Sequence, residues 1–345
     1  MEMQGKVSAL AKVGDFLGKF LTTDEAGYSA QQKDFAEILQ RSEIENPWFT
    51  QQNLRFALNS WAELLNEENL NNWLENYEFR NHGKRVGLIL AGNIPMVGFH
   101  DVICVILSGN FPLIKLSSKD RLLIPFLLKL WQEFSEGDVQ FEIVEKLQDF
   151  DAVIATGSNN TARYLEFYFK DKPRIIRKNR TSVAVLSGEE TDADLQNLAG
   201  DIFQYFGMGC RNVTRLFLPK SFEINRLFEN FMPFGHIINH HKYANNYDYN
   251  KAIFLLNRDD FWDNNFVMLR EEAGLFSPIS VLNFSRYENL QEVEEFITEN
   301  ETDIQAVVSN FQLTIPMVKF GEAQQPSLET YADNVDTMRF LAGLD

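Results

Sequence analysis

From residue 84 onward, short apolar segments typical of β-strands alternate with longer segments of helical periodicity. The first strand-like segments span residues 84–91, 111–117, 139–145 and 152–157. Helix-like segments separate most of them, and the one from about 119 to 134 places large apolar side chains at helical spacing. Strands that alternate with helices form a parallel sheet with helices on both faces. The alternation therefore predicts an α/β fold.

A second α/β region is predicted to begin with a strand at 182–188. Further helices are expected near 192–206, 221–232 and 288–299, and further strands near 213–219, 252–256, 279–284 and 305–308. Before residue 80, apolar residues repeat every three to four positions and predict helices. A chain of 345 residues suits about two domains. We therefore predict a first domain over 1–182, which includes a helical N-terminal segment, and a second domain over 183–345.

The charge balance and the length of the apolar runs exclude several classes of protein. The chain carries 32 Lys and Arg against 49 Asp and Glu, a net charge of -17, which argues against binding nucleic-acid phosphate. The longest apolar run, 102–107, is far shorter than the roughly 20 residues of a membrane-spanning helix. The N-terminus lacks the apolar core of a signal peptide. With only two cysteines, no disulfide framework is expected, and we predict a cytoplasmic protein.

Cys210 is the first candidate for chemistry. It follows the Gly207-Met208-Gly209 turn between a predicted helix and a predicted strand, and Arg211 is its neighbour. A thiolate is a strong nucleophile, and nearby cations lower the pKa of a thiol. The alternative is a small buried apolar residue, as most free cysteines are. Cys104 lies within an apolar run and is predicted to be part of the core.

Three polar groups stand at predicted strand ends, where open α/β sheets bind ligands. Asn93 follows the first strand, and its amide either polarises a carbonyl or caps the next helix, with Pro95 in the first turn. Gly157 and Ser158 follow another strand and either hold a phosphate or form a plain N-cap. Lys115 ends a strand and could bind a ribose or phosphate.

Two further patterns concern the binding of a metal or of an anionic cofactor. His236 and His240 have helical i, i+4 spacing, but no third ligand has metal spacing, so no metal site is predicted. Basic residues cluster between Arg163 and Arg180, either to attract an anionic cofactor or as a solvated face.

Taken in order, these segments resemble the aldehyde dehydrogenase superfamily, and within it the LuxC-type acyl-CoA reductase family. The matching segments are GNIPMVGFHDVICVILSGNFPLIKLSSKD (92–120), ATGS (155–158), ADLQNLAGDIFQYFGMGCRNVTRLFLP (193–219), EEAGLFSPISVL (271–282) and YADNVDTMRFL (331–341). The resemblance covers the chain from about residue 80 to its end. It implies two doubly wound α/β domains, a Rossmann-like cofactor domain and a catalytic domain.

The resemblance also implies a role for individual residues. Cys210 would be the nucleophile that takes the acyl group as a thioester, with the Asn93 amide and the Cys210 backbone N–H as its oxyanion hole. The cofactor contacts would be Lys115 and Ser117 at the adenosine ribose, Gly157 and Ser158 at the pyrophosphate, and Glu272 at the nicotinamide ribose. The spacing from Glu272 to Phe276 is longer than in the family pattern.

Two departures from the superfamily pattern bear on the reaction. The oxidising enzymes carry Glu-Leu-Gly-Gly-Lys, whose Glu activates the hydrolytic water, where this chain has Ile176-Arg177-Lys178-Asn179-Arg180. Without that base, an acyl-enzyme would persist until it is reduced. The Glu of Lys-Pro-Ser-Glu, which favours a free ribose 2′-hydroxyl, is Ser118 here, followed by Lys119 and Arg121. Losing an anion and gaining cations favours a 2′-phosphate and therefore NADPH.

The function expected from this resemblance is the NADPH-dependent reduction of a fatty acyl thioester, such as acyl-CoA, to an aldehyde. The acyl donor could also be an acyl-protein synthetase partner, and a homo-oligomer is expected. Two alternatives stay open: an NAD-dependent oxidising aldehyde dehydrogenase, which needs a replacement for the base at Ile176, and a catalytically silent binding protein. The retained Cys210 and Asn93 argue against the second.

Overall fold

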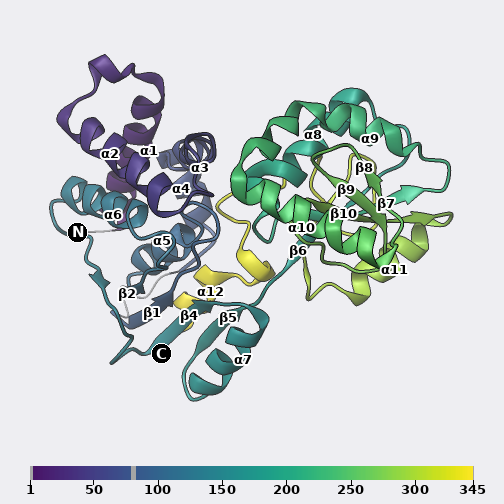
Figure 1. Cartoon of the computed structure of the whole chain (residues 1–345). Coiled ribbons are helices and arrows are strands. Elements are labelled where there is room, and N and C mark those ends of the chain that lie inside the picture. Colours follow the sequence, from purple (N-terminus) through teal and green to yellow (C-terminus); the bar gives the residue numbers. More distant parts are fainter. Residues whose placement is uncertain (1–2, 79–82, 345) are drawn as a thin grey trace. The chain divides into compact units, whose positions relative to one another are not determined.

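The chain folds into two compact units (Figure 1). The structure is a computed structural model that describes residues 3–78 and 83–344. One unit comprises residues 1–178 and 327–345, and the other comprises residues 179–326.

Four helices precede the first strand, as the apolar spacing predicts. They are α1 (Met3–Thr22), α2 (Ala30–Glu45), α3 (Gln51–Leu64) and α4 (Glu67–Leu74), with a short 3₁₀ turn η1 (Glu25–Gly27). Polar side chains set the helix starts: Ser29 forms a capping box with Gln32, and Thr50 and Asn66 cap the next two helices. Helix α1 packs on α3 and on α6, which buries its apolar face.

The first unit contains a parallel five-stranded sheet in the order β3-β2-β1-β4-β5. Its strands are β1 (Arg85–Ile89), β2 (Phe111–Lys115), β3 (Glu142–Ile143), β4 (Ala152–Thr156) and β5 (Arg174–Arg177), and its helices are α5 (Phe99–Leu107), α6 (Leu123–Phe134) and α7 (Asn159–Tyr168). Ile176 joins the apolar cluster that includes Leu165 of α7, whereas its neighbour Arg177 pairs with Asp101 of α5. Side chains alternate between the faces of a strand, so α7 and α5 cover opposite faces.

The second unit contains a six-stranded sheet in the order β11-β6-β7-β10-β9-β8. Its strands are β6 (Thr181–Val185), β7 (Val213–Pro219), β8 (Trp262–Asp263), β9 (Met268–Glu271), β10 (Val281–Tyr287) and β11 (Ile304–Val308). Its helices are α8 (Asp192–Phe203), α9 (Ile224–Phe231), α10 (His241–Asn257) and α11 (Leu290–Glu299), with 3₁₀ turns η2 (Gln204–Gly207) and η3 (Met232–Asn239). Only the edge strand β8 is antiparallel among the described pairs. The predicted α/β architecture with a helical N-terminal segment is confirmed.

Several elements differ from the sequence prediction, among them β8 and β9, which were not predicted. The strand predicted at 252–256 is wrong, because these residues form the last turns of α10. The buried face of that helix repeats every three to four residues and is formed by Tyr243, Tyr247, Asn250 and Phe254. Strand β5 was not predicted, because only Ile175 and Ile176 are apolar in a segment rich in cations.

The C-terminal tail also differs from the predicted division, which placed it in the second domain. Residues 327–345, with η4 (Ala332–Asn334) and α12 (Thr337–Ala342), belong to the first unit. The indole N–H of Trp73 donates to the Tyr331 hydroxyl at 2.8 Å, and Arg177 donates to Thr337 Oγ1 at 2.9 Å. These buried polar contacts hold the tail against α4 and β5 of the first unit.

Candidate active site

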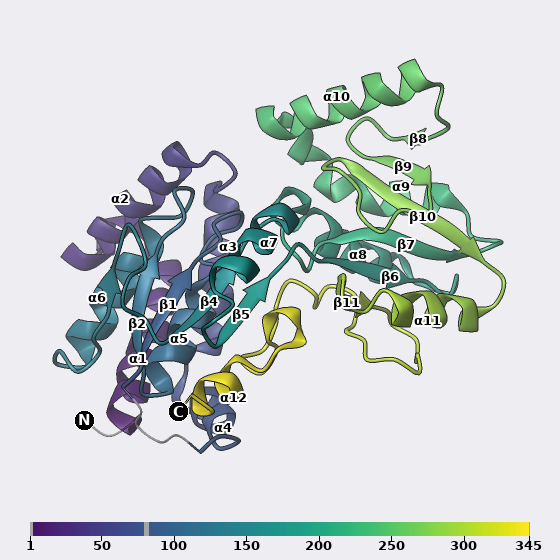
Figure 2. The same cartoon turned by 90° about the horizontal axis from the view of Figure 1, so that it is seen from below.

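The sheet order of the first unit gathers most of the predicted cofactor residues at one edge. Strands β2, β1 and β4 are parallel neighbours, so their carboxyl ends lie side by side (Figure 2). Asn93 follows β1, Lys115 ends β2 with Ser117 just beyond it, and Gly157 and Ser158 follow β4. Residues from three separate segments are thereby brought to the edge where such sheets bind ligands.

Gly92 is required by the close approach of two strand ends. A Cβ atom built on Gly92 would lie 2.6 Å from Oγ of Ser117, well inside contact distance. The backbone of the turn after β1 therefore packs against the Ser117 side chain in the turn after β2. Any larger residue at position 92 would push the two turns apart.

Asn93 does not cap the following helix. Helix α5 begins at Phe99 with Gly98 as its N-cap, and no side chain caps it. Asn93 is exposed, and its side-chain amide makes no hydrogen bond to any residue the structure describes. Pro95, expected in the first helical turn, lies in the preceding turn instead. The capping alternative is therefore wrong, and the amide is open to a ligand.

Asp120 fixes the end of the Asn93 turn, a role that the sequence analysis missed. Met96 adopts a left-handed backbone conformation (φ 55°), and its N–H donates to Oδ2 of Asp120 at 2.7 Å. Asp120 is buried, and its Oδ1 has no hydrogen-bond partner within the described residues. Burial raises the pKa of Asp120 to about 7, although the Met96 N–H bond works in the opposite direction.

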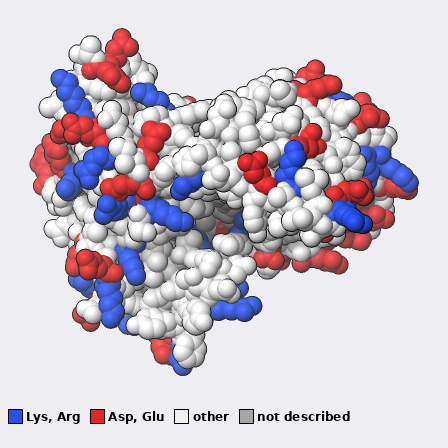
Figure 3. Space-filling model, in the orientation of Figure 1, with Lys and Arg blue, Asp and Glu red and all other residues white. Residues whose placement is uncertain are grey.

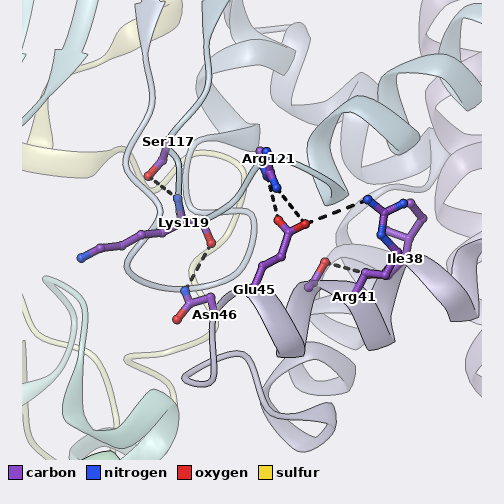
Figure 4. A network of polar contacts seen from close by, with 8 residues as sticks. Ile38, Arg41, Glu45, Asn46, Ser117, Lys119 and Arg121 are labelled. Carbon is purple, nitrogen blue, oxygen red and sulfur yellow. Dashed lines mark hydrogen bonds and ion pairs between the residues drawn. The ribbon is translucent and has the colours of Figure 1, made fainter.

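The loop from Ser117 to Arg121 carries the cations on which the NADPH prediction depends. Oγ of Ser117 accepts the Lys119 backbone N–H at 3.2 Å (Figure 4). Arg121 is not free, because its guanidinium donates two hydrogen bonds to Glu45, at 2.8 and 3.0 Å. Lys119 forms no ion pair with a described residue, and its side chain points away from the Arg121–Glu45 pair. The free cations of this edge are thus Lys119 and Lys115, and the expectation that Arg121 adds its charge needs correction.

Gly157 and Ser158 are largely engaged within the protein. Ser158 is the N-cap of α7 and accepts the Thr161 N–H at 3.3 Å. The Gly157 N–H donates to the Arg177 carbonyl at 3.1 Å, and a Cβ on Gly157 would lie 2.9 Å from the Thr161 side chain. The N-cap interpretation is confirmed for Ser158.

Two of the seven cations between Arg163 and Arg180 form ion pairs. Arg174 donates to Glu166 at 2.7 Å, and Arg177 forms a buried ion pair with Asp101. Figure 3 likewise shows basic side chains interspersed with acidic ones on the face in view. Arg174 and Arg177 therefore contribute to the structure around β5 and α7.

In the second unit, Cys210 lies in a strained loop between α8 and β7. Helix α8 ends at Phe203, three residues earlier than predicted. Tyr205 (φ 54°), Phe206 (φ 60°), Gly207 (φ 76°) and Gly209 (φ 102°) then all adopt left-handed conformations. Such conformations cost non-glycine residues about 1–2 kcal/mol each. Strain of this kind persists only where the surrounding structure enforces it, and it is frequent at functional sites.

The surroundings of Cys210 suit a reactive thiol better than a core residue. Cys210 is partly exposed, and its carbonyl accepts the Ser182 hydroxyl at 3.1 Å. Burial lowers the pKa of Arg211, and the charge of Cys210 opposes that shift, so the two side chains interact electrostatically. Arg215 instead donates to the Ala273 carbonyl and to Ser285. Cys104 is fully buried, and burial raises the pKa of its thiol well above the usual value, as expected for a core cysteine.

A small pocket lies within the second unit beside the Cys210 loop. Both flanks of Cys210 contribute to its wall, Phe206 and Gly207 before it and Asn212 and Val213 after it. The remaining lining residues are Ile202, Phe203, Tyr243, Val267, Ser277, Pro278, Ile279, Ser280 and Val281. The wall therefore combines aromatic and aliphatic side chains with polar groups such as Asn212, Ser277 and Ser280.

Comparison with known families agrees with the arrangement of these segments. Residues 15–226, more than half of the chain, match the family described as LuxC, acyl-CoA reductase. The chain belongs to the LuxC acyl-CoA reductase family. Members of this family are oxidoreductases, so the chain is an enzyme of aldehyde-related oxidation and reduction. No curated protein matches the sequence.

Solved structures show that this LuxC-family chain has the aldehyde dehydrogenase fold. An NAD⁺ complex of a Mycobacterium tuberculosis aldehyde dehydrogenase matches with a TM-score of 0.61 and 14% identity, over 90% of this chain and 73% of the other. Aldehyde dehydrogenase 21 of Physcomitrella patens, with succinate, matches with a TM-score of 0.66 and 12% identity, over 99% and 84%. An NAD-dependent aldehyde dehydrogenase of Sinorhizobium meliloti matches with a TM-score of 0.64 and 14% identity, over 90% and 70%.

Glu272 directly follows the carboxyl end of β9. The Cys210 loop instead precedes β7, at the amino ends of these parallel strands. The Glu272 backbone N–H donates to the Phe284 carbonyl at 3.0 Å, and Phe284 pairs with Leu216 in the middle of β7. At about 3.3 Å per residue, this level is about 10 Å along β7 from its first residue, Val213. The Glu272 carboxylate is 3.6 Å from the Arg270 guanidinium. Its role at a nicotinamide ribose stays a prediction.

Neither a metal site nor a membrane-spanning helix is found among the described residues. Within residues 3–78 and 83–344, no three His, Cys, Asp or Glu side chains come together as a metal site would require. No helix in the described part of this LuxC-family chain is both long and apolar enough to cross a membrane.

Proposed function

We propose that this enzyme reduces a fatty acyl thioester, such as acyl-CoA, to an aldehyde by way of an acyl-Cys210 intermediate, with NADPH as reductant. The observation that carries the proposal is the Cys210 thiol itself. It is partly exposed on a loop held in left-handed conformations, next to the Arg211 cation and beside a small pocket. These are the surroundings in which a thiol acts as a nucleophile.

In the acylation step the Cys210 thiolate attacks the carbonyl carbon of the substrate thioester. A sulfur–carbon bond forms at Cys210, the bond to the donor sulfur breaks, and the donor leaves as a thiol after it takes up a proton. Arg211 favours the thiolate electrostatically. The exposed Asn93 amide, which is not used as a helix cap, is proposed as a hydrogen-bond donor to the carbonyl oxygen.

The carboxyl edge of the first sheet fits a nucleotide. Gly92 keeps the strand ends close, and Gly157 lets the chain turn tightly into α7, whose N-terminal amides favour a phosphate. Lys115 and Ser117 are proposed for the ribose, Ser158 for the pyrophosphate and Lys119 for a ribose 2′-phosphate. Bound there, NADPH would supply the hydride. Glu272 is proposed for the nicotinamide ribose.

Reduction rather than hydrolysis is supported by the packing at Ile176. In the oxidising enzymes that this chain resembles, a Glu at this position activates water. Here Ile176 packs in an apolar cluster with Val153, Ala155 and Phe169. An acyl-enzyme made on Cys210 is therefore expected to persist in the absence of a reductant.

The acyl chain and the donor are further parts of the proposal. A path for the acyl chain is proposed to begin at the small pocket beside the Cys210 loop, whose wall includes Phe203 and Phe206. The donor would be acyl-CoA, a carrier protein or a partner acyl-protein synthetase. A cytoplasmic location and a homo-oligomeric state are further parts of the proposal.

A single-turnover acylation experiment tests the function. The protein is incubated with a radiolabelled long-chain acyl-CoA, and intact-mass spectrometry with product analysis follows, with and without NADPH. We expect a stable acyl adduct without NADPH and its discharge as aldehyde when NADPH is added. Cys210→Ala should abolish the adduct, and Cys104→Ala is the matched control that should retain it.

Three outcomes contradict the proposal. An adduct on Cys210→Ala would rule out this nucleophile. Rapid release of free fatty acid without NADPH would indicate an oxidising-type enzyme that activates water by another residue. Discharge by NADH but not by NADPH would leave the reductase chemistry intact and overturn the cofactor assignment.

A further inference from the structure

The last turn of helix α2 holds the loop that is proposed to meet the cofactor ribose. Glu45, the final residue of α2, accepts both hydrogen bonds of Arg121, at 2.8 and 3.0 Å (Figure 4). The next residue, Asn46, donates its side-chain amide to the Lys119 carbonyl at 3.2 Å. Two polar contacts thus join the N-terminal helices to residues 117–121. The family resemblance did not assign any role to these helices.

The two contacts differ in what they do to charge. The Asn46 contact is neutral and fixes the backbone of the loop. The Glu45 contact cancels the charge of Arg121, and the hydrogen bond to Arg121 also lowers the pKa of Glu45, so both partners remain ionised at neutral pH. Arg41 lies 4.0 Å from the Glu45 carboxylate and is a weaker second partner. The loop therefore presents the positive charge of Lys119 next to a neutralised pair.

We propose that Glu45 is a specificity-determining residue for the nucleotide. By pairing with Arg121, it limits the attraction of the loop for a ribose 2′-phosphate to that of Lys119. The inference rests on the proposed function, because it concerns how the proposed cofactor edge discriminates between phosphorylated and unphosphorylated ribose.

Charge arithmetic predicts the effect of each substitution. Glu45→Gln removes the anion and leaves Arg121 free to attract a phosphate. Arg121→Gln has the opposite effect, because it leaves Glu45 unpaired and repulsive. In the double variant both charges are gone, and the net charge of the pair is zero, as in the wild type. A unit charge near a doubly charged phosphate at a protein surface changes affinity by about threefold to tenfold at low salt.

The experiment measures binding and needs no turnover. Isothermal titration calorimetry of the full chain, at low and high salt, gives the dissociation constants of adenosine 2′,5′-bisphosphate and of 5′-AMP. Their ratio isolates the 2′-phosphate. The variants are Glu45→Gln, Arg121→Gln and the double variant. Glu43→Gln, which makes the same change in net charge two residues earlier in α2, is the control.

The expected result is a ratio shifted about threefold to tenfold toward the bisphosphate in Glu45→Gln, shifted the other way in Arg121→Gln, and close to the wild type in the double variant. The shifts should shrink at high salt. Glu43→Gln should leave the ratio unchanged.

Each contrary result has a separate meaning. If all variants bind both nucleotides with an unchanged ratio, or if Glu45→Gln shifts the ratio in the same direction as Arg121→Gln, Glu45 only holds the loop and the inference is wrong. If the wild type binds neither nucleotide, the proposed cofactor edge is wrong as well, and both proposals fall together.

Discussion

The buried carboxyl of Asp120 makes a prediction that can be worked out from its surroundings. Asp120 is 4% exposed, accepts one backbone N–H from Met96, and has a second oxygen with no partner in the described part of the chain. Burial therefore raises its pKa from 3.8 in the unfolded chain to about 7 in the folded protein. A carboxyl of this kind is expected to be protonated when the protein folds at mildly acidic pH.

The sign of the effect on stability follows from proton binding. Between pH 4 and 7 the folded protein holds a proton that the unfolded chain releases, so stability is greatest below pH 4 and falls as the pH rises to about 7. A difference of about three pKa units amounts to about 4 kcal/mol in all. Of this, about 2–3 kcal/mol is lost between pH 5 and pH 8. Asp120→Asn cannot ionise, yet its side-chain oxygen can still accept the Met96 N–H.

The measurement is the free energy of unfolding of the wild type and of Asp120→Asn in urea at pH 5, 6, 7 and 8. Tryptophan fluorescence follows the first unit, which contains four of the five tryptophans. We expect the stability of Asp120→Asn, relative to the wild type, to rise by about 2–3 kcal/mol from pH 5 to pH 8. Asp34→Asn, a substitution at an exposed site on α2, should show no such trend. A difference that is constant across this pH range would refute the argument from burial.

Three further substitutions test the site and its frame. Asn93→Ala should lower single-turnover reduction by about 100- to 1,000-fold while the dissociation constant of NADPH changes little; a loss below threefold would mean that the amide is not a catalytic donor. Arg177→Met should destabilise the first unit by about 3–5 kcal/mol in urea unfolding, because Asp101 is left buried and unpaired; a loss under 1 kcal/mol would show that the ion pair is easily replaced. Ile176→Glu should lower the melting temperature and should not speed hydrolysis of the acyl-enzyme, because its side chain enters an apolar cluster; fast release of fatty acid would instead show that the new carboxylate reaches the thioester.

Much of the fold could be predicted because its signals are local. The alternation of strand and helix patterns gave the parallel sheets, and the order of β2, β1 and β4 then places their carboxyl ends together. The errors arose where a short apolar run has no period long enough to distinguish a strand from a helix, as at 252–256. Strand β5 was missed because its two apolar residues are flanked by Arg174 and Arg177, whose charges are paired with carboxylates on α7 and α5 that the local sequence does not reveal.

The parts of the site that could not be predicted depend on contacts between residues far apart in the sequence. The Arg121–Glu45 pair joins residues separated by 76 positions, and the Asp120–Met96 contact joins residues separated by 24. Nothing in the sequence near Arg121 shows that its charge is cancelled. A count of cations along the chain therefore overestimates the positive charge available to a ligand, and only the folded structure corrects it.

The Cys210 loop shows how tertiary packing decides a local conformation. The residues up to 206 have helical periodicity, yet α8 ends at Phe203, and Tyr205 and Phe206 turn left-handed. Both aromatic side chains are buried, at 6% and 7% exposure. Burying each contributes about 1.5–3 kcal/mol, which offsets about 1–2 kcal/mol of backbone strain per residue. Because the helix stops early, its negative C-terminal end lies seven residues before Cys210 and not four, and a helix dipole acts only over about one turn. The early stop therefore removes an effect that would otherwise disfavour the thiolate.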